Sequence, residues 1–137
     1  MPGTGIEVLI DTEAVRLVYR REDKIVHHEF RQFVHGPALR GVLERGVQAM
    51  EKYKAQKWLS DDRGNGPLKP ADEEWGKTHW FPRAIASGWK HWAVVMPEAV
   101  LGQMNMRRWI ELYASAGIHA HPFDDPQLAL KWLREQP

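Results

Sequence analysis

The spacing of apolar residues changes at Gly36-Pro37, and this change constrains the fold more than any other feature of the sequence. Before this point, apolar residues alternate with polar ones over short runs that are separated by charged turns. A period of two over short runs indicates β-strands with one buried side. Three such strands are predicted at residues 6–10, 15–19 and 24–34, the last with Val26, Phe30 and Val34 on one face. Short turns between them predict an antiparallel meander.

After this point the spacing becomes helical. Proline suits the first turn of a helix, and an apolar stripe at steps of three and four residues then runs from Leu39 to Tyr53. The rest of the chain alternates short apolar runs with helical segments. Strands are predicted at 58–62, 92–96 and 118–123, and helices at 70–87, 98–116 and 126–134. The strand at 92–96 is nearly all apolar, as expected of a strand buried on both faces.

The predicted order of elements is therefore βββαβαβαβα. Helices between the later strands imply parallel pairing with right-handed crossovers. We predict an α/β fold, a mixed β-sheet in which an N-terminal antiparallel meander is followed by alternating α/β units, with helices packed on the sheet. The length of 137 residues is close to the commonest size of one domain, so residues 1–137 are predicted to form a single domain.

Pro82 lies inside the predicted helix 70–87. A proline there removes one backbone hydrogen bond and clashes with the preceding turn. We therefore expect two helical pieces or a clear kink at Trp80-Phe81-Pro82. Gly88 is expected to end the second piece.

Composition excludes several classes of protein. The absence of cysteine excludes disulfides, thiolate metal sites and a cysteine nucleophile. Lysine and arginine total 19 against 18 aspartate and glutamate, whereas a nucleic-acid binder usually has a clear basic excess. Met1–Gly5 does not resemble the start of a signal peptide, and no run approaches the ~18 apolar residues that cross a bilayer. A cytoplasmic location without membrane insertion is expected.

The loop Asp61–Gly66 is the strongest candidate binding site. It follows a predicted central strand, and ligands of open α/β sheets bind beyond the carboxyl ends of strands. Its glycines allow a close backbone approach, Arg63 could bond a carboxylate or phosphate, and the next helix could turn its N-terminus toward an anion. In the alternative interpretation, the aspartates only cap and brace a tight turn. The loop lacks the glycine-lysine-serine/threonine ending of a P-loop.

An aromatic cluster lies next to this loop, in the residues Trp75, His79, Trp80 and Phe81. It could form a wall for a small ligand or a docking face for a partner; the alternative is packing of a short helix onto the sheet. The candidate ligand- or partner-binding residues are Asp61, Asp62, Arg63, Asn65, Trp80 and Arg83.

No catalytic residue is predicted. Asp61 and Asp62 are adjacent, so their side chains should point to opposite faces of a strand and not share a proton. No serine lies in a nucleophile-elbow pattern.

Neither a metal ion nor another cofactor is predicted. His119 and His121 are two residues apart in a predicted strand and could reach one ion, but no third ligand has suitable spacing. His27 and His28 are adjacent and should face opposite ways.

Three short motifs resemble a bacterial family. They are Lys57–Arg63 (KWLSDDR), Trp80–Ala84 followed by Gly88, and Ala93–Pro97. The chain resembles the SpoIIAA-like proteins of the STAS superfamily. This resemblance implies a mixed sheet flanked by helices and regulatory or ligand-binding roles without catalysis. The anti-sigma antagonists of that superfamily carry a phosphorylatable serine after an aspartate, but the corresponding Asp62-Arg63-Gly64 has no hydroxyl group. The phosphorylation switch is therefore not carried over.

These observations together predict a non-catalytic cytoplasmic STAS-like regulatory or binding module that recognises a protein partner or small ligand near the Asp61–Gly66 loop. A carrier of an apolar ligand such as a lipid is the alternative, and a homodimer is left open. A hydrolytic or metal-dependent enzyme using Asp61, Asp62 and histidines is a further alternative. A deep apolar cavity would favour the carrier, and a shallow polar groove the partner-binding module. Carboxylate and imidazole groups around an ion would favour the enzyme.

Overall fold

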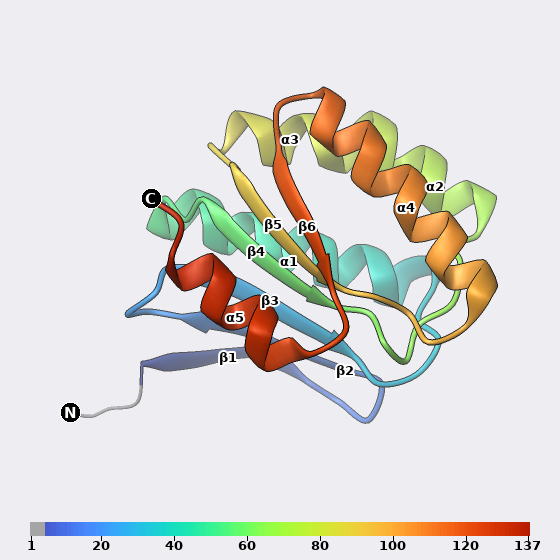
Figure 1. Ribbon diagram of the computed structural model, residues 1–137, viewed down its shortest axis with the longest axis horizontal. Helices are drawn as coiled ribbons and strands as arrows, with labels where there is room; N and C mark the ends of the chain where they lie inside the picture. The colour runs from blue at the N-terminus through green and yellow to red at the C-terminus, as the bar shows by residue number, and fades with distance from the viewer. Residues whose placement is uncertain (1–4) are drawn as a thin grey trace.

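The computed structural model describes residues 5–137, which contain a six-stranded mixed sheet (Figure 1). The first three strands pair antiparallel, and from the third strand onward all pairs are parallel. The strands lie across the sheet in chain order: β1 (Ile6–Asp11), β2 (Val15–Arg20), β3 (Ile25–Phe30), β4 (Lys57–Asp61), β5 (His91–Val95) and β6 (His119–Phe123). The predicted α/β class, with its meander and alternating units, is confirmed. The signal-peptide prediction rests mostly on residues 1–4, which lie outside the described residues.

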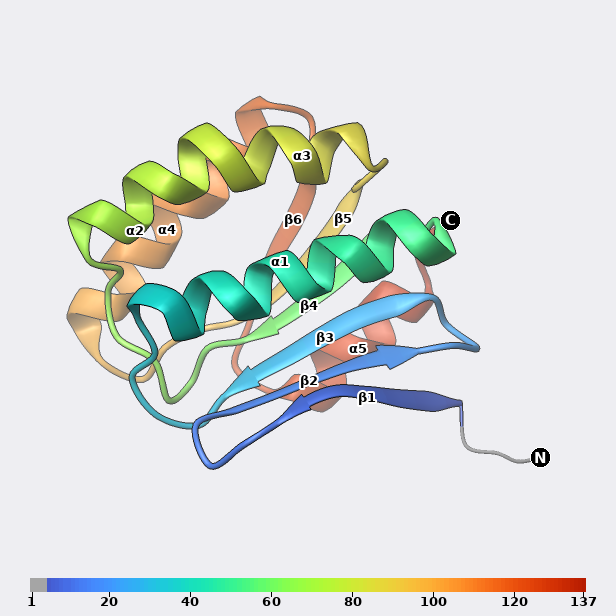
Figure 2. The ribbon, with the colours of Figure 1, turned by 180° about the vertical axis from the view of Figure 1, so that it is seen from behind.

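The helices cover the two faces of the sheet unequally (Figures 1 and 2). One face is covered by α1 (Gly36–Tyr53), α2 (Pro70–Trp75), the π-helical segment η1 (Gly76–Trp80), α3 (Phe81–Ala86) and α4 (Val100–Ser115). Among the helices of residues 5–137, only α5 (Pro126–Arg134) covers the opposite face. This follows from the order of the parallel strands, because crossovers that share one handedness and always advance in one direction place their helices on the same face.

Two cores fill the space between these layers. The larger core lies under α1–α4 and is rich in aromatic side chains, including Trp58, Trp80, Trp92 and Trp109. The smaller core packs α5 against residues such as Leu59 and Val95. Residues 92–95 of β5 are all buried, which confirms the prediction of a strand covered on both faces.

The expected separation into two helical pieces or a kink near Pro82 is replaced by a wider helical turn, because α2, η1 and α3 follow one another as one continuous helical run (Figure 2). In η1 the backbone N–H of Phe81 donates to the carbonyl of Gly76, five residues earlier. Pro82 is the second residue of α3, where a missing backbone N–H costs little. Gly88 has φ of 103° and follows the end of α3, as predicted.

Two predicted boundaries differ from the structure by two residues or more. The third strand ends at Phe30 instead of Val34, because the backbone N–H of Val34 donates to the side chain of Asn65 and not to a neighbouring strand. Helix α4 begins at Val100 instead of Glu98, because the backbone of Ala99 is extended, and the N–H of Glu98 donates to the carbonyl of Arg63. Both differences arise from contacts with the loop that follows β4.

No helix within residues 5–137 is long and apolar enough to cross a membrane.

Candidate binding site

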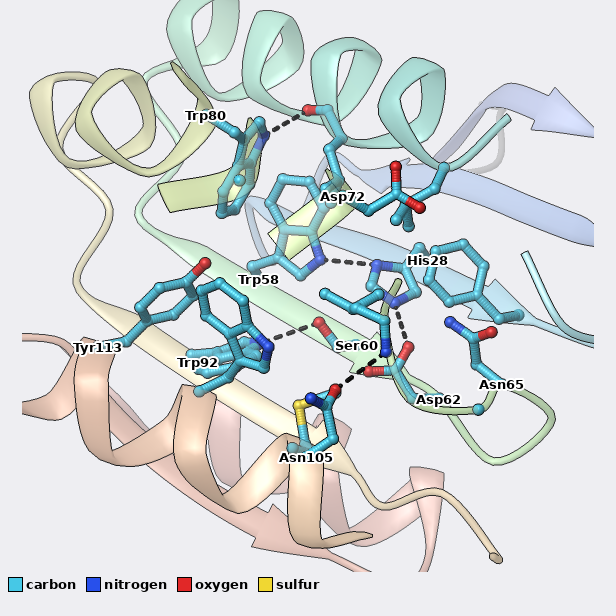
Figure 3. Close-up of a pocket in the computed structure, with 18 of the residues that line it drawn as sticks. His28, Trp58, Ser60, Asp62, Asn65, Asp72, Trp80, Trp92, Asn105 and Tyr113 are labelled. Carbon is cyan, nitrogen blue, oxygen red and sulfur yellow. Dashed lines mark hydrogen bonds and ion pairs between the residues drawn. The ribbon is translucent and has the colours of Figure 1, made fainter. Parts of the chain in front are cut away.

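A cavity of about 80 Å³ lies between the sheet and helices α1, α2 and α4 (Figure 3). We call it the aromatic pocket. Its lining is mostly apolar, and its polar end lies beside the carboxyl ends of β3 and β4. Five of the seven tryptophans of the chain line it: Trp58, Trp80, Trp89, Trp92 and Trp109. A largely apolar cavity with a few polar groups at the strand ends is typical of a small-molecule site.

The alternation of side chains along β4 decides which residues reach this pocket. Trp58 and Ser60 point toward the helices, and Asp62, the next residue in this series, does the same. Asp61 points to the opposite face, where it lines a separate depression. The prediction that Asp61 and Asp62 face opposite ways is therefore confirmed. On the adjacent β3, His28 pairs with Ser60 and also faces the pocket.

A buried chain of hydrogen bonds fixes the carboxylate of Asp62 (Figure 3). The indole N–H of Trp58 donates to Nδ1 of His28 at 3.0 Å, and Nε2 of His28 lies 2.8 Å from Oδ1 of Asp62. An indole nitrogen only donates, so Nδ1 of His28 carries no proton and the proton of the neutral imidazole is on Nε2. His28 therefore donates to Asp62. All three residues are at most 3 % exposed.

Several polar atoms at the pocket have no partner within residues 5–137. Asp62 is 3 % exposed, and its Oδ2 accepts no hydrogen bond within residues 5–137, but this oxygen keeps some contact with solvent. Asn105 accepts from the backbone N–H of Leu68 through Oδ1, which leaves its amide NH₂ without a protein acceptor. The indole N–H of Trp109 is also buried without a partner. Buried polar groups are nearly always hydrogen-bonded, so the Trp109 indole and the two open groups beside it could bind water or a ligand in the pocket.

Asp72 lies at the edge of the pocket but is fully used by the fold. Its carboxylate accepts from the backbone N–H of Gly36 at 2.9 Å and from Nε of Arg40 at 3.2 Å. These bonds tie the start of α1 to α2. Asp72 therefore differs from Asp62, whose second oxygen remains open.

The predicted site residues are distributed over three places. Asp62, Asn65 and Trp80 line the aromatic pocket. Asp61 and Arg63 line a depression of about 190 Å³ on the face that α5 partly covers. There Arg63 bonds both carboxylate oxygens of Asp61, at 3.0 and 2.9 Å. This is the bracing contact of the alternative interpretation.

The last predicted residue, Arg83, lies away from both sites. It forms two hydrogen bonds with Glu51, at 2.9 and 2.8 Å, which join α3 to α1 at the surface. The close backbone approach expected at the glycines does occur, but within the protein. A Cβ on Gly64 would lie 2.7 Å from the backbone of Phe30 and Arg31.

The remaining histidines do not form a metal centre. Burial, followed by the charge of Arg20, lowers the pKa of His27 to about 3, so this imidazole is neutral at physiological pH. His119 and His121 are exposed beside Trp132. No group of three His, Cys, Asp or Glu side chains within residues 5–137 could hold a metal ion.

Of the five tryptophans that line the aromatic pocket, sequence reasoning selected only Trp80, and it also missed His28. The alternation in β3 and β4 places His28, Trp58, Ser60 and Asp62 on one face once the two strands are paired. That pairing register was the missing information. Asn105 and Trp109 come from α4, and no local pattern links this helix to the loop after β4.

Comparison of the chain with protein-family models, curated proteins and solved structures finds no match.

Proposed function

We propose that the protein is a non-catalytic regulatory module that binds a small ligand in the aromatic pocket. The observation that carries this proposal is Asp62, a buried carboxylate that His28 holds in place and whose second oxygen has no partner within residues 5–137. Such an oxygen can fix the orientation of a ligand that the tryptophans enclose. A pocket held this rigidly before binding loses little conformational entropy when a ligand enters.

The state of His28 supports binding over turnover. A general base needs a free lone pair, but Nδ1 of His28 already accepts from the indole of Trp58. The hydroxyl of Ser60 accepts from the indole of Trp92 at 2.8 Å, and no hydrogen bond within residues 5–137 joins it to a base such as the neighbouring His28. These residues position groups and do not transfer protons.

The volume of the pocket limits the enclosed part of the ligand. The cavity of about 80 Å³ is roughly half of the ~150 Å³ apolar cavity that accepts one benzene. The second candidate function, a carrier of an apolar ligand, is favoured by the mostly apolar lining. The small volume and the open carboxylate oxygen favour a small ligand with a polar group over an acyl chain.

The resemblance to SpoIIAA-like proteins of the STAS superfamily belongs to this proposal, as does a cytoplasmic location. In this interpretation, ligand occupancy would replace phosphorylation as the regulatory signal. Ser60 is the only serine or threonine among the residues that line the pocket, and it is 4 % exposed. A protein kinase would need a more accessible hydroxyl.

Filling the pocket tests the proposal. A Cβ on Gly76 would have its nearest contact at 4.0 Å, on the ring of Trp109, so Gly76→Ala fits and Gly76→Leu should extend into the cavity. Gly41→Leu is the matched control, because Gly41 lies exposed on α1 with open space around it. A library of small fragments is titrated against all three variants and the wild type, with tryptophan fluorescence as the readout.

We expect some fragments to bind the wild type, Gly41→Leu and Gly76→Ala proteins. The same fragments should not bind Gly76→Leu. Equal binding to all four proteins would place the fragments elsewhere. A library without hits on the wild type would count against a small-ligand site.

A further inference from the structure

The charge balance of the aromatic pocket identifies a class of ligand. Its lining contains one imidazole and two carboxylates, those of His28, Asp62 and Asp72. His28 is neutral, because its Nδ1 accepts from the indole N–H of Trp58 and therefore carries no proton. The charge of Asp72 is balanced by Arg40 at 3.2 Å. The formal negative charge of Asp62 has only the neutral imidazole beside it, so the pocket has a net charge of minus one.

An uncompensated carboxylate is costly at this depth. Asp62 is 3 % exposed, and buried charges in proteins are normally paired with an opposite charge. Within residues 5–137, the only ion-pair geometry at Asp62 is the one with His28. Arg63, the cation next to it in the sequence, turns away and pairs with Asp61 on the other face of the sheet. No cation within residues 5–137 balances Asp62, and a bound ligand could supply the positive charge.

The walls of the pocket suit a positive charge. The face of a tryptophan ring attracts cations, and this attraction is strongest where water is excluded. Edge-to-face contacts join Trp58 to Trp80 and Trp89 to Trp92, with ring centres 5.4 and 5.6 Å apart. Such contacts hold the rings in fixed orientations before a ligand arrives. The same chemistry occurs at the surface of this protein, where the guanidinium of Arg40 lies over the ring of Trp75.

We propose that the ligand of the aromatic pocket enters with a small nitrogen cation, a primary ammonium, amidinium or guanidinium group, that donates an N–H to Oδ2 of Asp62 and lies against the tryptophan rings. This inference rests on the proposed small-ligand function and names the chemistry of its ligand. A cation without N–H groups could not bond Asp62. The unpaired amide NH₂ of Asn105 would bind an acceptor atom elsewhere on the ligand.

Guanidinium and urea provide a matched pair of probes, because both are planar and of similar size and only guanidinium is charged. Each is titrated at millimolar concentration and constant ionic strength, with tryptophan fluorescence as the readout. Asp62→Asn removes the charge and keeps an oxygen that can accept from His28. Asp124→Asn is the control, since Asp124 is exposed and outside the pocket.

We expect guanidinium to bind the wild type and Asp124→Asn saturably. In Asp62→Asn its Kd should rise ~10-fold or more, because a hydrogen bond to a charged group is worth that much in binding. Urea should bind the wild type at least ~10-fold more weakly than guanidinium. A guanidinium Kd that is the same in Asp62→Asn, or equal binding of urea, would overturn the cation assignment.

A second variant keeps the test decisive if Asp62→Asn does not fold. Met106 lines the pocket from α4 and is half-buried, so Met106→Lys would supply a cation from the protein itself. We expect Met106→Lys to abolish guanidinium binding and Met106→Leu to retain it. Unchanged binding in Met106→Lys would contradict the proposal.

The fragment experiment separates the two proposals. Neutral fragments that Gly76→Leu excludes, combined with no saturable guanidinium binding, would overturn the cation assignment and leave the small-ligand function standing. If no fragment and no guanidinium bound in a way that Gly76→Leu abolishes, both the small-ligand function and the cation assignment would be overturned.

Discussion

At the scale of single residues, two adjacent carboxylates have separate roles. Asp61 and Asp62 are both 3 % exposed, yet they lie on opposite faces of the sheet. Asp61 is paired with Arg63 through two hydrogen bonds, whereas Asp62 accepts one bond from neutral His28. Asp61 is therefore held by a contact within the fold, whereas Asp62 keeps a free acceptor oxygen, which we propose for ligand binding.

Arg63→Ala tests the structural role of this pair. The substitution leaves the buried carboxylate of Asp61 without its partner, which should lower the free energy of unfolding by about 1–2 kcal/mol. The loss should be smaller than for a fully buried pair, because the Arg63 side chain is 41 % exposed. Thermal unfolding should show a Tm several degrees lower. Binding in the aromatic pocket should be unchanged. An unchanged Tm together with weakened binding would instead assign Arg63 to a ligand site.

His27 predicts a specific dependence of stability on pH. Burial lowers its pKa in the folded protein to about 3, from an ordinary value of 6.5. The unfolded chain therefore binds one more proton between these values, and the stabilisation from His27 is complete above pH 6.5 and is lost as the pH falls toward 3. The slope from this one group is at most about 1.4 kcal/mol per pH unit.

The variant His27→Asn isolates this effect, because an asparagine oxygen can accept from Arg20 in place of Nδ1. Urea unfolding of both proteins between pH 4 and 7 should give a steeper loss of stability for the wild type, by close to one proton. Parallel curves would show that His27 titrates normally in the folded protein.

At the scale of secondary-structure elements, the close packing of α1 on β4 depends on one glycine. Gly46 lies in the middle of α1, and a Cβ at this position would overlap the six-membered ring of Trp58. Trp58 cannot easily move away, because it is 1 % exposed and its indole N–H bonds His28. The glycine lets the helix approach closely enough to enclose the aromatic pocket.

Gly46→Ala should therefore destabilise the protein by about 3 kcal/mol, toward the upper end of the range for an overpacked core. Gly41→Ala, on the same helix, is the matched control. It should stabilise the protein by about 0.5–1 kcal/mol, because Gly41 is exposed with open space around it and alanine is the better helix former. Chemical unfolding of both variants measures the difference. Similar stabilities would show that α1 and Trp58 do not pack as described.

At the scale of the whole molecule, the two faces of the sheet are used differently. The face under α1–α4 contains the larger core and the aromatic pocket. The face under α5 contains the smaller core, the Asp61–Arg63 pair and the histidines of β6. The single loop after β4 reaches both faces, because consecutive residues at the end of a strand point in opposite directions.

Removal of metal ions should leave the whole molecule unchanged. The chain has no cysteine, and no cluster of three ligand-type side chains lies within residues 5–137. Calorimetric unfolding with and without a chelator should therefore give the same Tm. Stoichiometric zinc that survives purification and is lost in His119→Ala would contradict this prediction.

The sequence by itself determined the order of the elements and the alternation of side chains along each strand. Period two before Gly36 and helical spacing after Pro37 predicted the order of strands and helices, and Pro82 indicated the position of the wider helical turn before α3. These features are local, because backbone hydrogen bonding and the burial of one face repeat over a few residues. The opposition of Asp61 and Asp62 follows from the same alternation.

Only the tertiary structure decided which of these residues meet. His28 precedes Asp62 by 34 positions, and their contact depends on the parallel register that places His28 beside Ser60. Asn105 reaches the pocket from a helix 37 residues after Leu68. Register and helix placement are set by the packing of the whole core, so no window of sequence contains them. For this reason the predicted site around Arg63 was divided between two faces, while the aromatic pocket was assembled from elements distant in the chain.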